Sequence, residues 1–464
     1  MNSPQGESRR RFLERIAAAC ALAGGSAFAS DADAARPRSA KRGANAGRGA
    51  SPGRGAGGGK SVPKPDAYGL PERQPYGHVN RKANLPPWDG ATSSDSPPGQ
   101  MRMFRGNRRH DYQGSGKLGT DLKVLWKFRM SDYATLKHGQ PTVWQGTGWT
   151  GQTLKVGAYV FIGSTGGHLH CFEAATGALV WVLAADRCFK GSPCFYRNRI
   201  YIPNVDNHLR CVDAATGALL WKWRSPNDMD SSPLVVDGVL YVGGEDGAVK
   251  AFDPESGRLL WRVPFGVGEG EKPGSGGIES SLAIDDGVAY FGHLDGNVRA
   301  LDLKTRTLRW QTAIGGDTDA SPLLAGDRLY IGCQCPPTSF HCLSRATGEV
   351  LWTKDIAGGV WSTAAAAAGM VIVGGHDGGM HALDAATGEG RWVARAGAAI
   401  WSSPAIVDGK VIFGSYDPYL RMVDLKTGSQ LWRADLGGRS HSAPAIEDGK
   451  IWVGSASGWY YCFG

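Results

Sequence analysis

One pattern repeats along most of this sequence, and its clearest copy is Ala251–Trp261, with the letters AFDPESGRLLW. The tryptophans that end successive copies lie 40, 40, 49, 42, 40 and 40 residues apart. They are Trp181, Trp221, Trp261, Trp310, Trp352, Trp392 and Trp432. A fixed period in this range is typical of solenoids and propellers, in which neighbouring repeats bury each other's apolar faces. The repeat therefore constrains the fold more than any other feature.

Each copy is expected to form four short antiparallel strands. Asp-Gly pairs such as Asp237-Gly238 and Asp246-Gly247 separate β-branched and aromatic runs, as in hairpins whose turns need positive φ. Four strands per repeat are typical of a propeller blade. We expect the repeated acid, Asp253 in this copy, to accept hydrogen bonds from turn amides. The tryptophan is large and rigid enough to fill the gap between neighbouring blades.

The two ends of the repeat region complement each other. The last copy, Ser442–Gly464, ends before its tryptophan strand, and a lone matching strand lies far upstream at Leu122–Phe128. Pairing the two removes an open sheet edge that would invite aggregation. The sequence thus predicts an all-β fold, an eight-bladed β-propeller whose N-terminal strand completes the C-terminal blade.

Residues 1–29 have the features of a twin-arginine signal peptide. Ser8–Leu13 reads SRRRFL and precedes a short alanine-rich run, with a small-residue cleavage site at Ala27–Ala29 and a second choice at Ala32–Ala34. Such segments are export addresses, and this run is too short to cross a bilayer. We therefore predict that the protein is exported by the twin-arginine route, is periplasmic or secreted, and has no transmembrane span. We separately expect it to be a monomer.

Residues 30–65 are rich in Gly, Ala, Arg and Pro and are expected to form a disordered linker. The first 64 residues hold 12 Lys/Arg and 4 Asp/Glu, and their net charge of +8 equals that of the whole chain. The remainder is balanced, which argues against a nucleic-acid surface on the repeats. The proline-rich segment 66–119 is expected to wrap irregularly on the propeller, which spans 120–464.

The cysteines indicate packing more than chemistry. Four of them occupy the same place in different repeats, where other repeats have alanine, which marks a small buried position: Cys171, Cys211, Cys342 and Cys462. A local disulfide among Cys333, Cys335 and Cys342 stays open, because exported proteins can oxidise their thiols. The sequence has no CxxCH motif, so covalent c-type haem is not indicated.

One position in each repeat is a candidate for a functional site. It lies three residues before the proline, or its equivalent, of an S-S-P-like signature that opens the first strand. The eight residues are His138, Lys190, Asp230, Glu279, Asp319, Trp361, Trp401 and His441. Because the innermost strands of a propeller line its channel, we expect these residues to form a ring at one channel mouth.

The ring is segregated by residue type. Asp230, Glu279 and Asp319 come from consecutive repeats and are the candidate ligands of Ca²⁺, which prefers hard oxygen atoms. They are also the candidate catalytic residues, since one aspartate would serve as the base towards an alcohol proton. The candidates for cofactor binding are Lys190, Trp361, Trp401, His138 and His441. The tryptophans would stack on a planar ligand, and Lys190 would meet its carboxylate.

A purely structural interpretation of the ring stays open. Channel mouths are wet, so the acids can simply hydrogen-bond to backbone amides or pair with nearby basic groups, and the tryptophans can plug the channel. His138 and His441 supply only two ligands, which do not complete a zinc site. Loop Gly146–Gln152 is an expected exposed insertion, in which Trp149 either contacts a partner or folds back as a cap.

The repeats, of the form A-x-D-x-x-T-G-x-x-x-W, resemble those of the pyrroloquinoline-quinone (PQQ) type propellers over Leu122–Gly464. The resemblance implies kinship with calcium- and quinone-dependent alcohol dehydrogenases, which are eight-bladed. It equally implies kinship with a non-enzymatic outer-membrane assembly lipoprotein that holds proteins. This chain departs from the dehydrogenases, because it lacks their adjacent cysteine pair and most of their long insertions. Fold alone does not choose between these functions.

Three functional hypotheses follow. In the first, the chain is an exported propeller that binds a small ligand or a protein partner in the cell envelope. In the second, it is a periplasmic dehydrogenase that uses PQQ and Ca²⁺ to oxidise alcohols or sugars. In the third, it is a rigid scaffold tethered by its linker. The sequence leaves open whether the protein is an enzyme.

Overall fold

The computed structural model describes residues 81–112, 114–131, 133–137, 140–144, 146, 151–266, 277–334 and 339–464, with the backbone alone for 133–137 and 140–144. The predicted signal peptide (1–29), the linker (30–65) and the start of segment 66–119 lie outside these residues. So do His138, Trp149 and Cys335.

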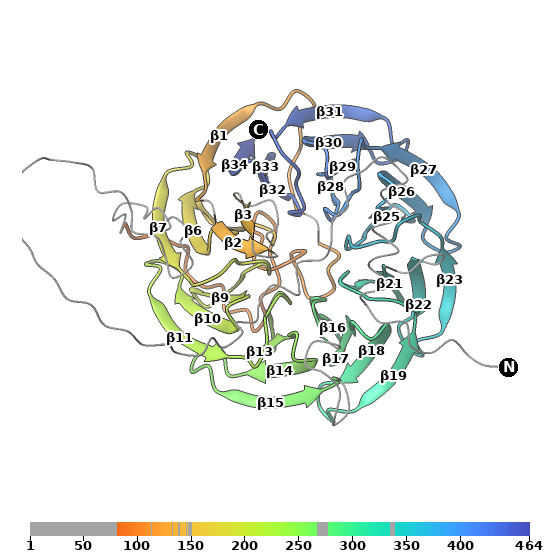
Figure 1. The fold of residues 1–464 in the computed structure, drawn as a ribbon, viewed down its shortest axis with the longest axis horizontal. Coiled ribbons are helices and arrows are strands. Elements are labelled where there is room, and N and C mark those ends of the chain that lie inside the picture. The colour runs from red at the N-terminus through yellow and green to blue at the C-terminus, as the bar shows by residue number, and fades with distance from the viewer. Residues whose placement is uncertain are drawn as a thin grey trace, which may run out of the picture. The chain divides into compact units, whose positions relative to one another are not determined.

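The chain divides into two compact units, Met1–Glu72 with Ala134–Val143, and Arg73–Tyr133 with Trp144–Gly464. In the first, β2 (Tyr133–Lys137) pairs with β3 (Gln140–Trp144) as a two-stranded sheet. The second consists of eight four-stranded antiparallel sheets around one axis (Figure 1), which confirms the predicted eight-bladed propeller. The described residues form no helix, and hence none long and apolar enough to cross a membrane.

Each blade runs from a three-residue innermost strand to a longer outer one. The first four blades are β4 (Leu154–Val156), β5 (Tyr159–Gly163), β6 (His168–Glu173) and β7 (Leu179–Ala184); β8 (Cys194–Tyr196), β9 (Arg199–Asn204), β10 (His208–Asp213) and β11 (Leu219–Arg224); β12 (Leu234–Val236), β13 (Val239–Val242), β14 (Ala248–Phe252) and β15 (Leu259–Pro264); and β16 (Ala283–Asp285), β17 (Val288–Gly292), β18 (Asn297–Asp302) and β19 (Leu308–Ala313). The next three are β20 (Leu323–Ala325), β21 (Arg328–Gly332), β22 (Phe340–Ser344) and β23 (Val350–Lys354); β24 (Ala365–Ala367), β25 (Met370–Gly374), β26 (Gly379–Asp384) and β27 (Gly390–Arg395); and β28 (Ala405–Val407), β29 (Lys410–Phe413), β30 (Tyr419–Asp424) and β31 (Gln430–Asp435).

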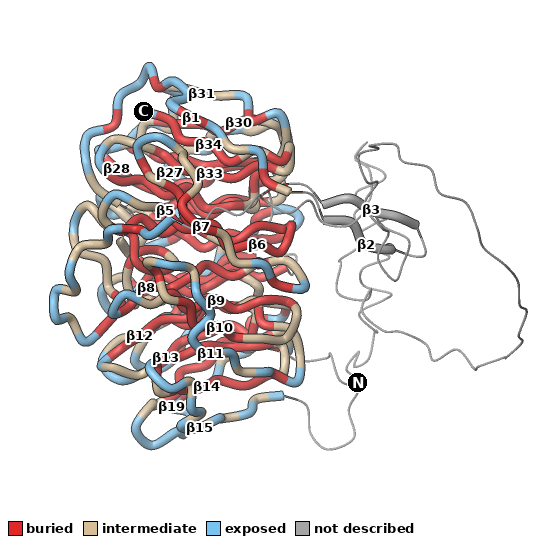
Figure 2. Tube along the Cα trace, turned by 90° about the vertical axis from the view of Figure 1, so that its left-hand side faces the viewer, coloured by how far each residue is buried: buried red, intermediate tan, exposed pale blue. Residues whose placement is uncertain are grey.

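The last blade is built from both ends of the repeat region. It contains β32 (Ala445–Glu447), β33 (Lys450–Gly454) and β34 (Trp459–Phe463), and its outermost strand is β1 (Val124–Arg129). Trp126 of β1 lies opposite Cys462 of β34 in an antiparallel pairing. The predicted closure of the ring by the N-terminal strand is therefore confirmed. Figure 2 shows the inner strands of the blades buried and the outer turns exposed.

The repeated tryptophan joins each blade to the next, as predicted. Trp221 donates a hydrogen bond of 3.1 Å from Nε1 to the carbonyl of Pro254 in the following blade. Its ring lies on the turn of that blade at Gly257. This glycine has a φ of 71°, and a side chain in its place would put a Cβ atom only 2.6 Å from the indole. Asp253 accepts the amide of Ser256 at 2.8 Å, which confirms the expected role of the repeated acid. Glycine is thus required at this turn by both its conformation and the indole.

The S-S-P-like signature forms a belt of hydrogen bonds around the channel. In each of six consecutive steps, a backbone amide at the start of one innermost strand donates to a side-chain hydroxyl of the next blade. The pairs are Gln152–Ser192, Ser192–Ser232, Ser232–Ser281, Ser281–Ser321, Ser321–Thr363 and Thr363–Ser403. Small hydroxyl residues recur here because each one satisfies a buried amide of its neighbour.

The chain before β1 fills the channel between the innermost strands. Arg105 is 1% exposed, and its guanidinium donates to the carbonyls of Pro404 (2.5 Å) and Ala364 (3.1 Å). His110 hydrogen-bonds through Nδ1 to the carbonyl of Pro322 at 2.8 Å. Backbone bonds from the same segment reach Phe195 on β8 at 2.7 Å, among other inner strands. This segment therefore satisfies strand edges that would otherwise face an empty channel.

Two details of the sequence interpretation need correction. The innermost strand of the first blade is β4, so the position equivalent to the other ring members is residue 150, whereas His138 precedes β3 of the separate hairpin. Loop Gly146–Gln152 is not wholly exposed, because Gln152 is 2% exposed and bonds through Nε2 to the carbonyl of Pro444 at 2.9 Å. The proline signature misplaced the ring position of this repeat because the hairpin carries its own proline, Pro141, three residues after His138.

The repeat-phase cysteines are buried, as expected. Cys171, Cys211, Cys342 and Cys462 are all free thiols inside the blades. Burial raises the pKa of Cys211 and of Cys462 to about 12, so these thiols stay protonated at neutral pH. No disulfide joins Cys333 to Cys342.

Candidate functional site

Two loops of each blade meet at one mouth of the channel. The backbone amide in the turn between the second and third strands donates to the carbonyl two residues before the predicted ring position. This bond recurs in seven blades at the pairs Val205–Cys188, Glu245–Asp228, Leu294–Gly277, Gln334–Asp317, His376–Gly359, Tyr416–Ala399 and Ala456–Arg439. The mouth is therefore lined by two registers of side chains, the predicted ring and a second one in these turns.

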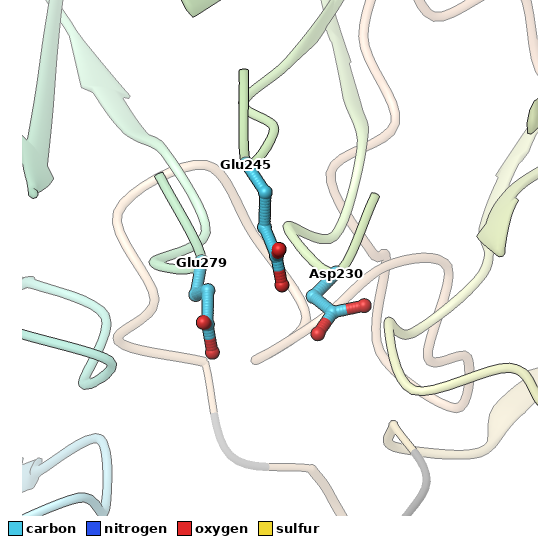
Figure 3. Close-up of side chains that lie close together, drawn as sticks. All are labelled: Asp230, Glu245 and Glu279. Carbon is cyan, nitrogen blue, oxygen red and sulfur yellow. The ribbon is translucent and has the colours of Figure 1, made fainter. Parts of the chain in front are cut away.

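Three carboxylates from two consecutive blades converge on one side of the mouth (Figure 3): Asp230 and Glu245 belong to the blade β12–β15, and Glu279 to the blade β16–β19. One oxygen from each of Asp230, Glu245 and Glu279 lies within 4.8 Å of the others. The Asp230 side chain is 7% exposed, and its Oδ2 accepts a 2.7 Å hydrogen bond from Lys190 Nζ. Its Oδ1 is buried and has no hydrogen-bond partner among the described residues. A buried carboxylate oxygen without a partner is costly unless a ligand meets it.

Among the residues that the structure describes, Lys190 brings the cluster one positive charge against several carboxylates. Burial raises the pKa of Glu245 well above its ordinary value, and the neighbouring Glu279 and Asp230 carboxylates raise it further. Burial and then the Asp230 carboxylate raise the pKa of Asp228 to about 6. Burial lowers the pKa of Lys190, but Asp230 and Glu279 outweigh it and hold this pKa well above its ordinary value. One ammonium group therefore does not neutralise the cluster.

Aromatic rings line the other side of the mouth. Trp361 and Trp401 are in direct contact, with ring centroids 3.7 Å apart and planes inclined by 59°. His376 stacks on Trp401 at 5.1 Å and meets Trp361 edge-on at 4.8 Å. The ring centroid of Tyr416 lies 4.5 Å from the centroids of both Trp401 and His441. We call the five rings the aromatic wall: Trp361, His376, Trp401, Tyr416 and His441.

The structure brings some of the predicted ring residues together and separates others. Lys190, Asp230 and Glu279 lie in the carboxylate cluster. Asp319 is not part of that three-carboxylate group; its Oδ2 accepts a 2.8 Å hydrogen bond from Gln334 Nε2. The remaining described members, Trp361, Trp401 and His441, belong to the aromatic wall.

Sequence reasoning missed the second register. Glu245, His376 and Tyr416 come from it, and each immediately precedes the aspartate of a turn such as Glu245-Asp246. Aligning that aspartate across the repeats would have found them, just as aligning the proline of the S-S-P-like signature located the ring. Their proximity to the ring depends on the backbone bond between the two loops, which the sequence does not reveal.

Comparisons with known proteins agree with the repeat pattern. A family model described as outer membrane protein assembly factor BamB matches residues 120–354 and 338–461. Among solved structures, a europium-containing methanol dehydrogenase is similar, with a TM-score of 0.66 and 17% identity, over 79% of this chain and 98% of that chain. A quinohemoprotein alcohol dehydrogenase from Pseudomonas putida HK5 is also similar, with a TM-score of 0.66 and 15% identity, over 82% of this chain and 83% of that chain.

A third similar structure, the quinohemoprotein alcohol dehydrogenase of Comamonas testosteroni, gives a TM-score of 0.64 and 14% identity, over 79% of this chain and 80% of that chain. No curated protein sequence matches this chain significantly. At such identities the structural likeness establishes the fold alone.

Proposed function

The chain belongs to the PQQ-like repeat family described as outer membrane protein assembly factor BamB, and we propose that it is an exported propeller that binds a small ligand in the cell envelope, with a divalent cation at its channel mouth. The export part rests on the twin-arginine motif at Ser8–Leu13 and on the family description, which names the outer membrane. The binding part rests on the channel mouth.

The observation that carries the proposal is the carboxylate cluster. Asp230, Glu245 and Glu279 offer oxygens within 4.8 Å of one another, and Asp230 Oδ1 is buried without a described partner. Hard oxygen ligands around a negative site suit Ca²⁺, which takes its ligands at about 2.3–2.6 Å. These residues thus fit a divalent cation. When bound, such a cation would offer further coordination positions to ligand oxygens.

The residues fit a quinone less well. A planar ring held between two indoles needs roughly twice the 3.5–4.0 Å carbon contact distance between them, whereas Trp361 and Trp401 touch at 3.7 Å. Lys190 is already engaged by Asp230, and the sequence has no adjacent cysteines. The channel mouth therefore does not favour a bound quinone. Adding PQQ and Ca²⁺ to the protein tests the dehydrogenase hypothesis directly.

Terbium luminescence tests the cation site directly. Tb³⁺ replaces Ca²⁺ on oxygen ligands, and tryptophans near the site sensitise its emission. We expect saturable emission that Ca²⁺ competes away. Asp230→Asn and Glu279→Gln should each weaken Tb³⁺ binding by about tenfold or more, since each removes one charged ligand.

Glu389→Gln is the matched control, because Glu389 is an exposed carboxylate on the outer turn after β26. Equal emission from the wild type and the Asp230→Asn variant would overturn the cation site. Added PQQ and Ca²⁺ that produced dye reduction with alcohols or sugars would replace this proposal with the dehydrogenase alternative.

A further inference from the structure

Two polar atoms in the aromatic wall lack a described partner. Trp361 Nε1 and His376 Nε2 are both buried, and neither has a hydrogen-bond partner among the described residues. Their rings meet edge-on with centroids 4.8 Å apart. Unsatisfied groups on adjacent rings at a channel mouth call for a ligand or an ordered water.

The protonation of His376 defines what that ligand must offer. Burial lowers the pKa of His376 to about 4, so the imidazole is neutral at pH 7. The backbone carbonyl of Gly358 acts to raise the pKa of the ring, against the effect of burial, and because Nε2 has no described partner this carbonyl favours the proton on Nδ1. His376 Nε2 is then an acceptor, while Trp361 Nε1 is only a donor.

A hydroxyl group both donates and accepts through a single oxygen atom, so one hydroxyl can serve both nitrogens. An ammonium group has no acceptor for the indole N–H, and a carboxylate has no donor for the imidazole nitrogen. The chemistry of the wall therefore selects neutral hydroxyl groups.

We propose that the ligand is a neutral carbohydrate, which spans the mouth between the cation and the aromatic wall. This inference rests on the proposed function, since the cation would coordinate hydroxyl oxygens at one end of the sugar. At the other end, hydroxyls would bond to Trp361 and His376. The apolar face of the sugar ring would pack on the exposed part of the indole and phenol rings of Trp401 and Tyr416.

The test uses sugars that share one ring and differ in charge. The probes are methyl α-D-glucopyranoside with its mannose and galactose counterparts, D-glucuronate and D-glucosamine, measured by saturation-transfer NMR with Ca²⁺ present. We expect millimolar binding of at least one neutral methyl glycoside and weaker binding of glucuronate, which has a carboxylate in place of one hydroxymethyl group. Trp361→Phe and His376→Phe should weaken this binding about tenfold, because each removes one hydrogen-bonding group from the wall.

Trp223→Phe is the matched control, since Trp223 lies on β11 and packs on Phe252 away from the mouth. Tb³⁺ binding should be unchanged in all three variants. If Tb³⁺ binds but no neutral glycoside does, or if glucuronate binds best, the carbohydrate inference is wrong and the cation site stands. If Tb³⁺ itself fails to bind, the proposed function falls as well.

Discussion

Trp432 donates a hydrogen bond of 3.0 Å from its indole to the carbonyl of Leu122, which lies 310 residues earlier in the chain. Five of the other repeat tryptophans donate the same bond to the next blade, and here it crosses the junction between the two ends of the propeller. The equivalent bond inside the ring joins Trp392 to Leu425, only 33 residues away. The junction therefore reproduces an ordinary blade interface.

Removing that one bond should loosen the junction selectively. Trp432→Phe and Trp392→Phe each lose one hydrogen bond and should cost about 1 kcal/mol of unfolding free energy. Only Trp432→Phe should speed hydrogen exchange in β1, because β1 is held by the junction. Equal exchange of β1 amides in both variants would contradict a separate opening of the junction.

One turn departs from the repeat and offers a stabilising substitution. Where other copies have glycine, Arg306 adopts φ of 63°, and its guanidinium lies 5.8 Å from the ring of Trp261. A left-handed conformation costs an L-residue about 1–2 kcal/mol. Arg306→Gly should therefore raise the unfolding free energy by about 1 kcal/mol, as measured by urea denaturation. Arg258→Gly, at an exposed position of another blade, should not raise it.

The channel segment should be held chiefly by Arg105. Its guanidinium satisfies the carbonyls of Pro404 and Ala364 inside the channel. Arg105→Met leaves both acceptors unsatisfied and should cost about 2–4 kcal/mol. Arg109→Met, which removes a half-exposed guanidinium from the same segment, should cost under about 1 kcal/mol. Similar thermal melting of the two variants would show that Arg105 does not anchor the segment.

Cation binding should depend on pH through Glu245. Because its pKa in the folded protein is raised, the folded state holds a proton that the unfolded state has released, so stability falls as pH rises above the ordinary carboxyl range. Ca²⁺ must displace this proton, so its affinity should increase with pH, and binding near pH 7 should release protons. Calorimetry in buffers of different ionisation enthalpy measures that release, which Glu245→Gln should abolish.

Export should require the paired arginines. Changing Arg9 and Arg10 to lysine together should leave the protein inside the cell, whereas the same change at Arg36 and Arg38 of the linker should not. Fractionation of cells expressing each variant measures this. Unchanged export of the Arg9/Arg10 variant would mean that another signal directs the chain.

The sequence by itself determined the architecture. The spacing of the repeats and their Asp-Gly turns predicted the blades, and the incomplete last copy predicted the pairing of β1 with β34. These signals can be read from the sequence because each is local or nearly identical between copies. The same repetition predicted the roles of residues such as Trp221 and Asp253. It also identified Asp230 and Glu279 as neighbours, since consecutive blades place equivalent residues side by side.

Only the tertiary structure decided how the channel mouth is composed. Glu245 and His376 join it through a backbone bond between two loops of one blade; this bond recurs in seven blades, but the spacing within neither loop shows that the two loops meet. Arg105 reaches Pro404 across 299 residues, and the hairpin β2–β3 stands where the spacing suggested a blade strand. A repeat specifies what recurs in every blade. Contacts that occur once depend on how the closed ring brings distant segments together, and no second copy exists to reveal them.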